Sequence, residues 1–186
     1  MTPPLEEYVD IVANDGIGAE VIGTVPRSQT NGKLHWTSHV IVKVGGLFLV
    51  TLRAQCNDKK YSGQWEIGIT ETVMSGEFRY AAARRGLEEE LLIHREQGQL
   101  RFLFNNFFRD PTTERNKKNA AGFLHIHDGI TPRPNPEEIA DWKLLQAGEI
   151  NRGIDERIMT FTALNVSMWE MFKDYVKQES GPYVRQ

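Results

Sequence analysis

The chain has few of the features that mark secreted or membrane proteins. It contains one cysteine, Cys56, so no disulfide can form within the chain, and this cysteine usage is typical of a reducing cytoplasm. No apolar run approaches the roughly 20 residues that a membrane-spanning helix needs. The start, MTPPLEEYVD, lacks the basic region and apolar core of a signal peptide. We therefore expect a cytoplasmic protein with no membrane partner.

An excess of positive charge is also lacking. The chain has 22 lysines and arginines against 25 aspartates and glutamates, which gives a formal net charge of −3. Proteins that bind nucleic acid usually carry a basic excess, so we expect no general affinity for nucleic acid. An anionic small molecule stays compatible with this balance, because a bound cation or a local basic cluster can reverse the charge at one site.

The pattern of apolar residues predicts mostly strands. A length of 186 residues and a hydrophobic content of 40% suit one domain over residues 1–186. Gly45-Gly46 separates two apolar segments by two residues, which is the spacing of a tight hairpin. The expected strands are two short ones within residues 8–27, joined by a turn at Asn14-Asp15-Gly16, followed by residues 39–44, 47–53, 64–73, 100–108 and 122–127.

Two segments have the composition of helices. Residues 74–93 are rich in alanine and leucine, with Ser75 as the expected N-cap and Glu77 in the first turn. Near the C-terminus, apolar residues recur at helical spacing and predict an amphipathic helix that covers a sheet. The order of strands, helix, strands and helix predicts an α/β layered sandwich with a mixed β-sheet. The apolar residues of the last segment are Phe161, Leu164, Met168, Phe172 and Tyr175.

The first helical segment carries three adjacent glutamates, Glu88, Glu89 and Glu90, shortly after Gly86. Such a run is usually a solvated helix face, but its spacing resembles the Nudix box. That motif reads G-x5-E-x7-R-E-U-x-E-E-x-G-U, in which U is aliphatic. The residues that match in register are Glu77, Arg85, Leu87, Glu89, Glu90 and Ile93.

The resemblance extends over residues 7–175, to the Nudix branch that contains isopentenyl-diphosphate isomerases and their hydrolase-like relatives. It implies a single Nudix domain with an α/β/α sandwich and a mixed β-sheet. Isomerisation is not implied, because this chain has Thr70 and Thr72 where the isomerases need a catalytic cysteine and a metal-binding histidine. The segments that carry the resemblance are EYVDIV, VIGTVPRS, LHWTSHVIVKV, LFLVTLRA, GQWEIG and NPEEIADWKLL.

The resemblance also implies a metal site for hydrolysis. Mg²⁺ prefers oxygen ligands and bridges to phosphate oxygens, so the expected cofactor is Mg²⁺ or Mn²⁺ and the expected substrate a small diphosphate compound, such as a nucleoside diphosphate derivative. Residues four apart lie on one helix face, so Arg85 is expected to pair with Glu89 and orient it. The predicted metal ligands are Glu77, Glu89 and Glu90, the catalytic residues Glu89, Glu90 and Arg85, and the substrate-binding residue Arg53.

Three positions depart from the box: Glu71 and Leu92 stand where it has glycine, and Gly86 where it has glutamate. Gly86 removes a carboxylate that the hydrolases use as a metal ligand. Glu88 does not replace it, because two residues turn a helix by about 200°. The degenerate box therefore leaves an alternative, a catalytically impaired Nudix-fold module that binds a ligand or protein. We expect that replacing Gly86 by glutamate stabilises the helix, returns the carboxylate and raises the affinity for a divalent metal. The competing expectation is a clash with a neighbour packed against the glycine.

Other residues leave two interpretations open. A lone histidine on a strand is more often packed than a metal ligand, a glutamate in a loop is more often at the surface than a general base, and aromatic residues are more often core than a stacking surface for a base. Arg53 could equally form a structural salt bridge, and the resemblance leaves a homodimer open. The residues concerned are His35, His39, Glu137, Glu138, Trp36, Trp65, Phe104, Phe107 and Phe108. Four loop lysines could attract phosphate or could simply be solvated charges; they are Lys59, Lys60, Lys117 and Lys118.

Overall fold

The computed structural model describes residues 6–13, 19–54, 62–110, 117–127 and 132–179. Some residues discussed above lie outside these ranges: Cys56, Lys59, Lys60 and the predicted turn Asn14-Asp15-Gly16. No described helix is long and apolar enough to cross a membrane. The elements are β1 (Tyr8–Val12), β2 (Val21–Pro26), η1 (Arg27–Gln29), β3 (His35–Val44), β4 (Leu47–Arg53), β5 (Trp65–Ile67), β6 (Ile69–Thr72), α1 (Arg79–Leu91), β7 (Gly98–Arg109), β8 (Lys117–His127), β9 (Ile139–Leu145), α2 (Ala147–Asp155) and α3 (Ala163–Glu179).

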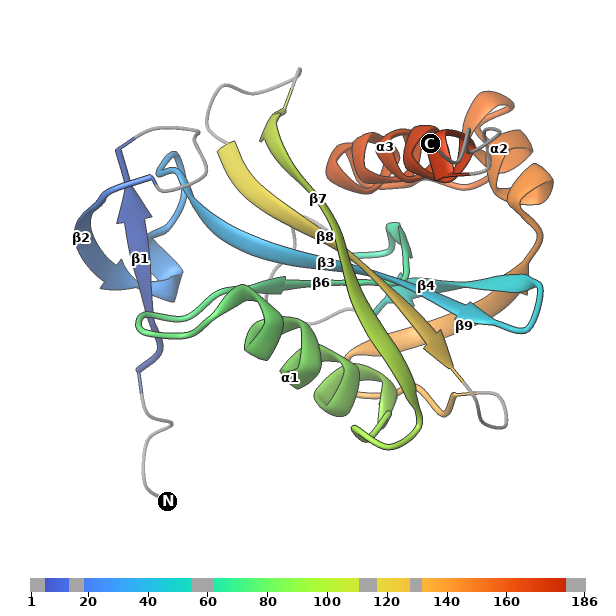
Figure 1. The fold of residues 1–186 in the computed structure, drawn as a ribbon, viewed down its shortest axis with the longest axis horizontal. Helices are drawn as coiled ribbons and strands as arrows, with labels where there is room; N and C mark the ends of the chain where they lie inside the picture. Colours follow the sequence, from blue (N-terminus) through green and yellow to red (C-terminus); the bar gives the residue numbers. More distant parts are fainter. Residues whose placement is uncertain (1–5, 14–18, 55–61, 111–116, 128–131, 180–186) are drawn as a thin grey trace, which may run out of the picture.

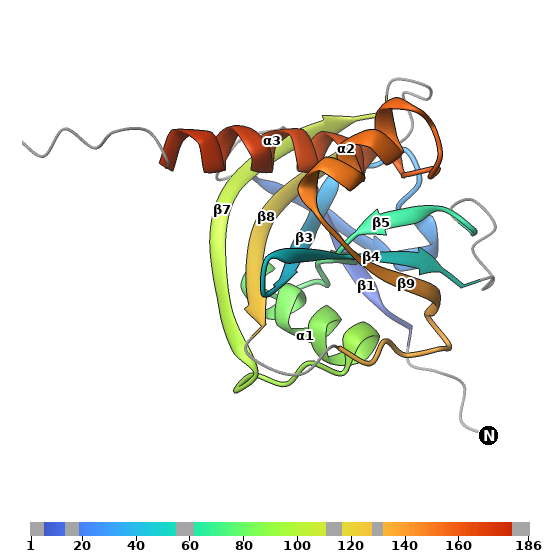
Figure 2. The ribbon, with the colours of Figure 1, turned by 90° about the vertical axis from the view of Figure 1, so that its right-hand side faces the viewer.

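The strands form one mixed sheet around β3. This strand pairs antiparallel with β1, β4 and β6, and parallel with β8. The sheet lies between α1 on one face and α2 and α3 on the other (Figure 1, Figure 2). The predicted α/β/α sandwich with a mixed sheet is confirmed. The two-residue hairpin is also confirmed, because Val44 and Leu47 pair across Gly45-Gly46.

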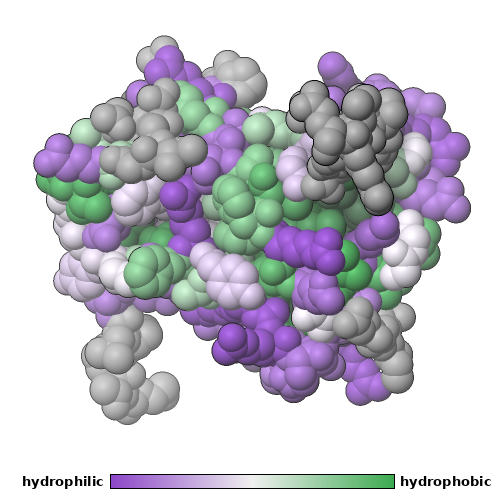
Figure 3. Space-filling model, in the orientation of Figure 1, coloured by the Kyte–Doolittle hydropathy of each residue, from purple (hydrophilic) through white to green (hydrophobic). Residues whose placement is uncertain are grey.

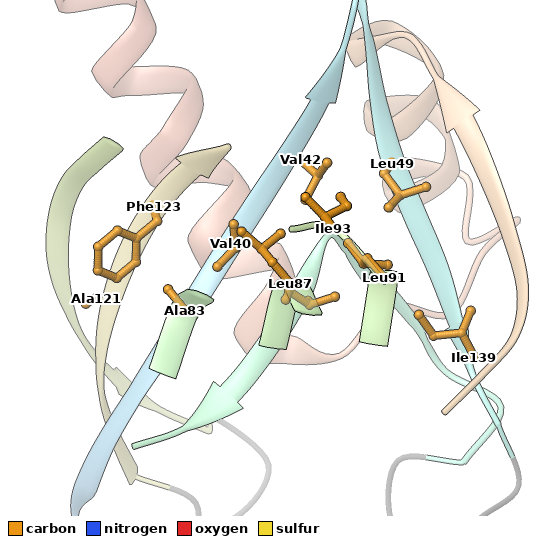
Figure 4. Close-up of a cluster of buried hydrophobic side chains, with 11 residues drawn as sticks. Val40, Val42, Leu49, Ala83, Leu87, Leu91, Ile93, Ala121, Phe123 and Ile139 are labelled. Atoms are coloured by element: carbon orange, nitrogen blue, oxygen red, sulfur yellow. The ribbon is translucent and has the colours of Figure 1, made fainter. Parts of the chain in front are cut away.

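One apolar cluster fixes α1 on the sheet. Ala83, Leu87 and Leu91 recur every four residues, which places them on one face of the helix. All three are fully buried in one cluster with side chains of β3, β4 and β8, such as Val40 and Leu49 (Figure 4). The opposite face of α1 is free to carry charge, and Figure 3 shows hydrophilic side chains along the border of the molecule where α1 lies.

A second cluster holds α3 against the other face of the sheet. Met168 and Trp169 of α3 are fully buried, and the ring of Trp169 lies 5.1 Å from that of Phe48 in β4. The predicted C-terminal amphipathic helix is thereby confirmed. The preceding helix α2 was not predicted; it begins with a capping box in which Gln146 and Glu149 satisfy each other's backbone N–H groups.

Several sequence predictions of element limits are wrong. The strand predicted over residues 39–44 begins at His35. Ser75 is not the N-cap of α1, because the helix begins at Arg79 after the extended residue Phe78. The predicted strand over residues 64–73 is two strands, β5 and β6, separated at Gly68. The strand predicted to begin at Gly122 begins at Lys117 instead, which gives β8 its full pairing with β3.

Candidate functional site

Arg85 lies on α1 at the centre of the acidic residues that the sequence singled out. Its Nη1 donates to Glu71 Oε2 at 2.7 Å and to Glu89 Oε2 at 3.3 Å. Its Nε and Nη2 donate to the two carboxylate oxygens of Glu77 at 3.1 and 3.2 Å, and Nη2 also donates to the carbonyl oxygen of Thr72. Burial alone would lower the pKa of the guanidinium, but Glu77 and Glu71 raise that pKa above its usual value. Arg85 is thus a fixed cation that orients three carboxylates.

The segment between β6 and α1 places Glu77 against Arg85. One oxygen of Glu77 also accepts the backbone N–H of Met74 at 3.0 Å, so this carboxylate closes the turn as well as the ion pair. The helix therefore starts only at Arg79, after the turn has returned the chain to Arg85. Glu77 does not belong to the lining of the neighbouring cavity.

A cavity of about 310 Å³ lies beside Arg85, at the lower end of the size range of small-molecule sites. Its walls come from η1, β6, α1 and the segment before β9. Asn135 fixes that last segment, because its N–H donates to the carbonyl oxygen of Glu90 at 2.7 Å and its side chain to that of Glu89 at 3.2 Å. The lining residues are Arg27, Glu71, Glu89, Glu90, Asn135 and Glu138.

Three glutamates are crowded where β5, β6 and α1 meet. Glu66 and Glu71 are only 5% and 6% exposed. Burial, and then the charges of Glu66 and Glu71, raise the pKa of Glu90 well above its usual value. Burial likewise raises the pKa values of Glu66 and Glu71, although Arg53 and Arg85 oppose it. The three carboxyl groups therefore repel one another when they are ionised.

This donor set fits a divalent cation chemically, because hard cations are held by carboxylate oxygens and relieve the repulsion between them. As the side chains are placed, no three histidine, cysteine, aspartate or glutamate residues within the described ranges lie close enough together to hold a metal ion. Binding a cation here therefore calls for rotation of the acidic side chains.

Arg53 stands at the end of β4 and reaches the same group of acids. Its Nη1 lies 3.4 Å from Glu66 Oε1, which is the structural salt bridge that the sequence left open. The Arg53 side chain is 26% exposed, so part of it faces solvent. A role in binding substrate stays a prediction.

The histidines that were compared with metal ligands are packed inside the sheet. His39 is fully buried, its Nδ1 lies 3.0 Å from Thr70 Oγ1, and burial lowers its pKa to about 3. His35 contacts Lys118 and the carbonyl oxygen of Lys33, and burial lowers its pKa to about 4, with Lys118 adding to the shift. Neither histidine lines the cavity.

The remaining candidates divide between core, surface and cavity. Phe108 is core, whereas Phe107 is 36% exposed. Glu138 lines the cavity and Glu137 does not. Sequence reasoning did not propose Arg27 or Asn135, because neither carries a motif and both reach the cavity only through the fold.

These features define a class: an α/β/α sandwich whose acidic helix and central arginine border a small cavity. The profile of the NUDIX domain matches residues 33–163 of the chain, and the chain therefore belongs to the Nudix family. No protein of curated function matches the chain in sequence.

Solved structures agree on the fold. The Deinococcus radiodurans protein DR0079 has a TM-score of 0.71 at 19% identity, over 87% of this chain and 97% of its own. The MutT protein of Methanosarcina mazei has a TM-score of 0.61 at 18% identity, over 77% and 96%. The Nudix domain of Shewanella oneidensis NrtR, solved with ADP-ribose, has a TM-score of 0.58 at 11% identity, over 77% and 87%. At these identities the likeness shows the shared fold.

Proposed function

We propose that the protein is a divalent-metal-dependent hydrolase of a small diphosphate compound, such as a nucleoside diphosphate derivative. The observation that supports this function best is the cavity, which is lined by Glu71, Glu89 and Glu90 together with Arg27. Acids that attract a cation and an arginine that attracts phosphate are the two charges such a substrate needs. Two solved structures with this fold support the proposal: the Nudix domain of NrtR in complex with ADP-ribose, and an Ap4A hydrolase of C. elegans.

The predicted ligands Glu89 and Glu90 line the cavity and would hold Mg²⁺ or Mn²⁺. Glu77 could join them only after releasing Arg85, since both its oxygens accept from that side chain. A bound cation supplies neutralisation of phosphate charge and lowers the pKa of a bound water. Arg85 keeps Glu89 oriented, and Arg53 would contact the substrate.

Glu138 is our candidate for accepting a proton from the attacking water. It lines the cavity from the segment before β9, and a carboxylate in such a position can act as general base. Thr70, which contacts His39 at 3.0 Å, offers no thiol for isomerase chemistry. We therefore place the chain with the hydrolase-like relatives of the isopentenyl-diphosphate isomerase branch.

The test is hydrolysis of a panel of diphosphate compounds with Mg²⁺ or Mn²⁺. We expect metal-dependent turnover of at least one compound, and a loss of about 100-fold or more in kcat/KM for Glu90→Gln, since electrostatic groups at such sites contribute that much. Glu88→Gln is the matched control, because Glu88 is exposed beyond the cavity lining. Absence of turnover with every compound and both metals would refute the proposal.

One observation favours a second function, a Nudix-fold module that binds a ligand or protein without hydrolysis. Among the described residues, no three histidine, cysteine, aspartate or glutamate side chains are already placed to hold a metal ion. Tight binding of a diphosphate compound, unchanged after long incubation with Mg²⁺ or Mn²⁺, would support this function over the first.

A further inference from the structure

Two departures from the Nudix box face each other in space. Gly86 is buried on the side of α1 that packs on β6, and Glu71 is the β6 residue that lies against it. A Cβ atom at position 86 would be 2.4 Å from Glu71 Cγ and 2.9 Å from Ile69 Cδ1. No real Cβ atom tolerates such separations, so a side chain at position 86 and the present side chain of Glu71 exclude one another.

The side chain of Glu71 therefore occupies the space into which a glutamate at position 86 would extend. Position 86 is three and four residues before Glu89 and Glu90, so a carboxylate there would share their helix face. Glu71 reaches the same place from the sheet. It lines the cavity together with Glu89 and Glu90, and one nitrogen of Arg85 bonds both Glu71 at 2.7 Å and Glu89 at 3.3 Å.

We propose that Glu71 supplies the third carboxylate of the metal site, in place of the glutamate that the box carries at position 86. The two departures are then one exchange, in which the carboxylate has moved from the helix to the neighbouring strand and the glycine from the strand region to the helix. This inference rests on the proposed function. It explains why Gly86 occupies a buried helix interior, where glycine is otherwise unfavourable.

The first test is Mn²⁺ binding, followed by the electron paramagnetic resonance signal of free Mn²⁺. Glu71→Gln keeps the shape of the side chain and removes its charge. We expect its Mn²⁺ affinity to fall by about tenfold or more, as mutation of even supporting residues of metal sites costs 10- to 100-fold. Glu88→Gln removes the same charge from the exposed side of α1 and is expected to bind Mn²⁺ like the parent. Equal affinity of Glu71→Gln and the parent would overturn the proposal.

The second test reverses the exchange. Gly86→Glu alone is expected to lower the melting temperature, because Glu71 fills the space. The stabilisation expected from helix propensity alone is therefore replaced by the clash. Combining it with Glu71→Gly frees that space, so the double variant should recover most of the lost melting temperature and bind Mn²⁺ within about threefold of the parent, since the same three oxygen donors face the cavity. A double variant that regains stability but not Mn²⁺ affinity would overturn the exchange, because a carboxylate at position 86 would then not replace that of Glu71.

The two proposals fail in different ways. A parent protein that binds Mn²⁺ and hydrolyses diphosphates, with Glu71→Gln unaffected, refutes only the role of Glu71. A parent that neither binds Mn²⁺ nor hydrolyses any compound refutes the proposed function and the role of Glu71 together. Recovery of the melting temperature in the double variant would still show that side chains at positions 71 and 86 compete for the same space.

Discussion

At the scale of single residues, Arg85 shows which contacts spacing can predict. Its pairing with Glu89 follows from a separation of four residues on one helix, and the observed distance of 3.3 Å agrees with it. Its shorter contact, 2.7 Å to Glu71, joins residues 14 apart on different elements. Periodicity carries no information about that contact, because it depends on how α1 packs on β6.

Leu92 adopts a backbone conformation that the box normally gives to glycine. It follows the last residue of α1 with φ 52° and ψ 31°, in the left-handed region. This conformation costs an ordinary L-residue roughly 1–2 kcal/mol. The leucine side chain is 50% exposed, so its burial offsets little of that cost. We predict that Leu92→Gly raises the free energy of unfolding by about 1 kcal/mol, measured by urea denaturation.

Leu92→Ala is the control for this prediction. Alanine removes the same exposed side chain but keeps the Cβ atom that makes the left-handed conformation costly. Its free energy of unfolding should stay near or below that of the parent. If alanine stabilised the protein as much as glycine, relief of backbone strain would not be the cause.

At the scale of elements, local pattern predicted most of the fold. The alanine- and leucine-rich composition of residues 74–93 predicted α1, and Gly45-Gly46 predicted the β3–β4 hairpin. The same reasoning missed α2, whose nine residues are short for a periodic signal. It also joined β5 and β6 into one strand, since the residues on both sides of Gly68 have the composition of strands.

Gly68 separates these two strands because the chain changes partner there. β5 pairs with β4, whereas β6 pairs with β3. Gly68 has φ 85°, and a Cβ atom on it would lie 1.9 Å from the carbonyl oxygen of Val40. We predict that Gly68→Ala lowers the free energy of unfolding by at least about 2 kcal/mol, from backbone strain and overpacking together.

Gly46→Ala is the matched comparison, because a Cβ atom at position 46 would meet nothing within 4 Å. Thermal unfolding of both variants compares them directly. A loss of 2 kcal/mol corresponds to a fall of about 4–8 °C in a protein of this size, whereas Gly46→Ala should change the melting temperature by much less. Equal melting temperatures would mean that the sheet can shift away from Val40 without cost.

At the scale of the whole molecule, the fold buries both acidic side chains and histidines. Glu66, Glu71 and Glu90 gather beside the cavity, and burial raises their pKa values. Their contribution to stability is therefore lost as the pH rises above the usual pKa of a glutamate. The box spacing indicated two of the acidic residues beside the cavity. The crowding of the three could not be predicted, because Glu66 and Glu71 reach Glu90 only when β5, β6 and α1 are packed together.

The buried histidines have the opposite effect: their contribution to stability is lost as the pH falls. His39 has its pKa lowered to about 3 by burial, against about 6.5 in the unfolded chain. Below pH 6.5 the unfolded chain takes up a proton that the folded protein excludes. The contribution of His39 is thus complete above pH 6.5 and is lost as the pH falls toward 3. By pH 5 the loss is about 2 kcal/mol relative to pH 8.

We predict that His39→Gln removes this part of the acid sensitivity. Urea denaturation at pH 8 and pH 5 gives the fall in unfolding free energy for the parent and the variant. The fall should be smaller in His39→Gln by about 2 kcal/mol, whatever constant cost the substitution brings, because that cost cancels between the two pH values. His94→Gln replaces an exposed histidine and should leave the parent's fall unchanged. An equal fall in His39→Gln and the parent would mean that His39 is protonated in the folded protein at pH 5, with water or a rearranged sheet solvating its ring.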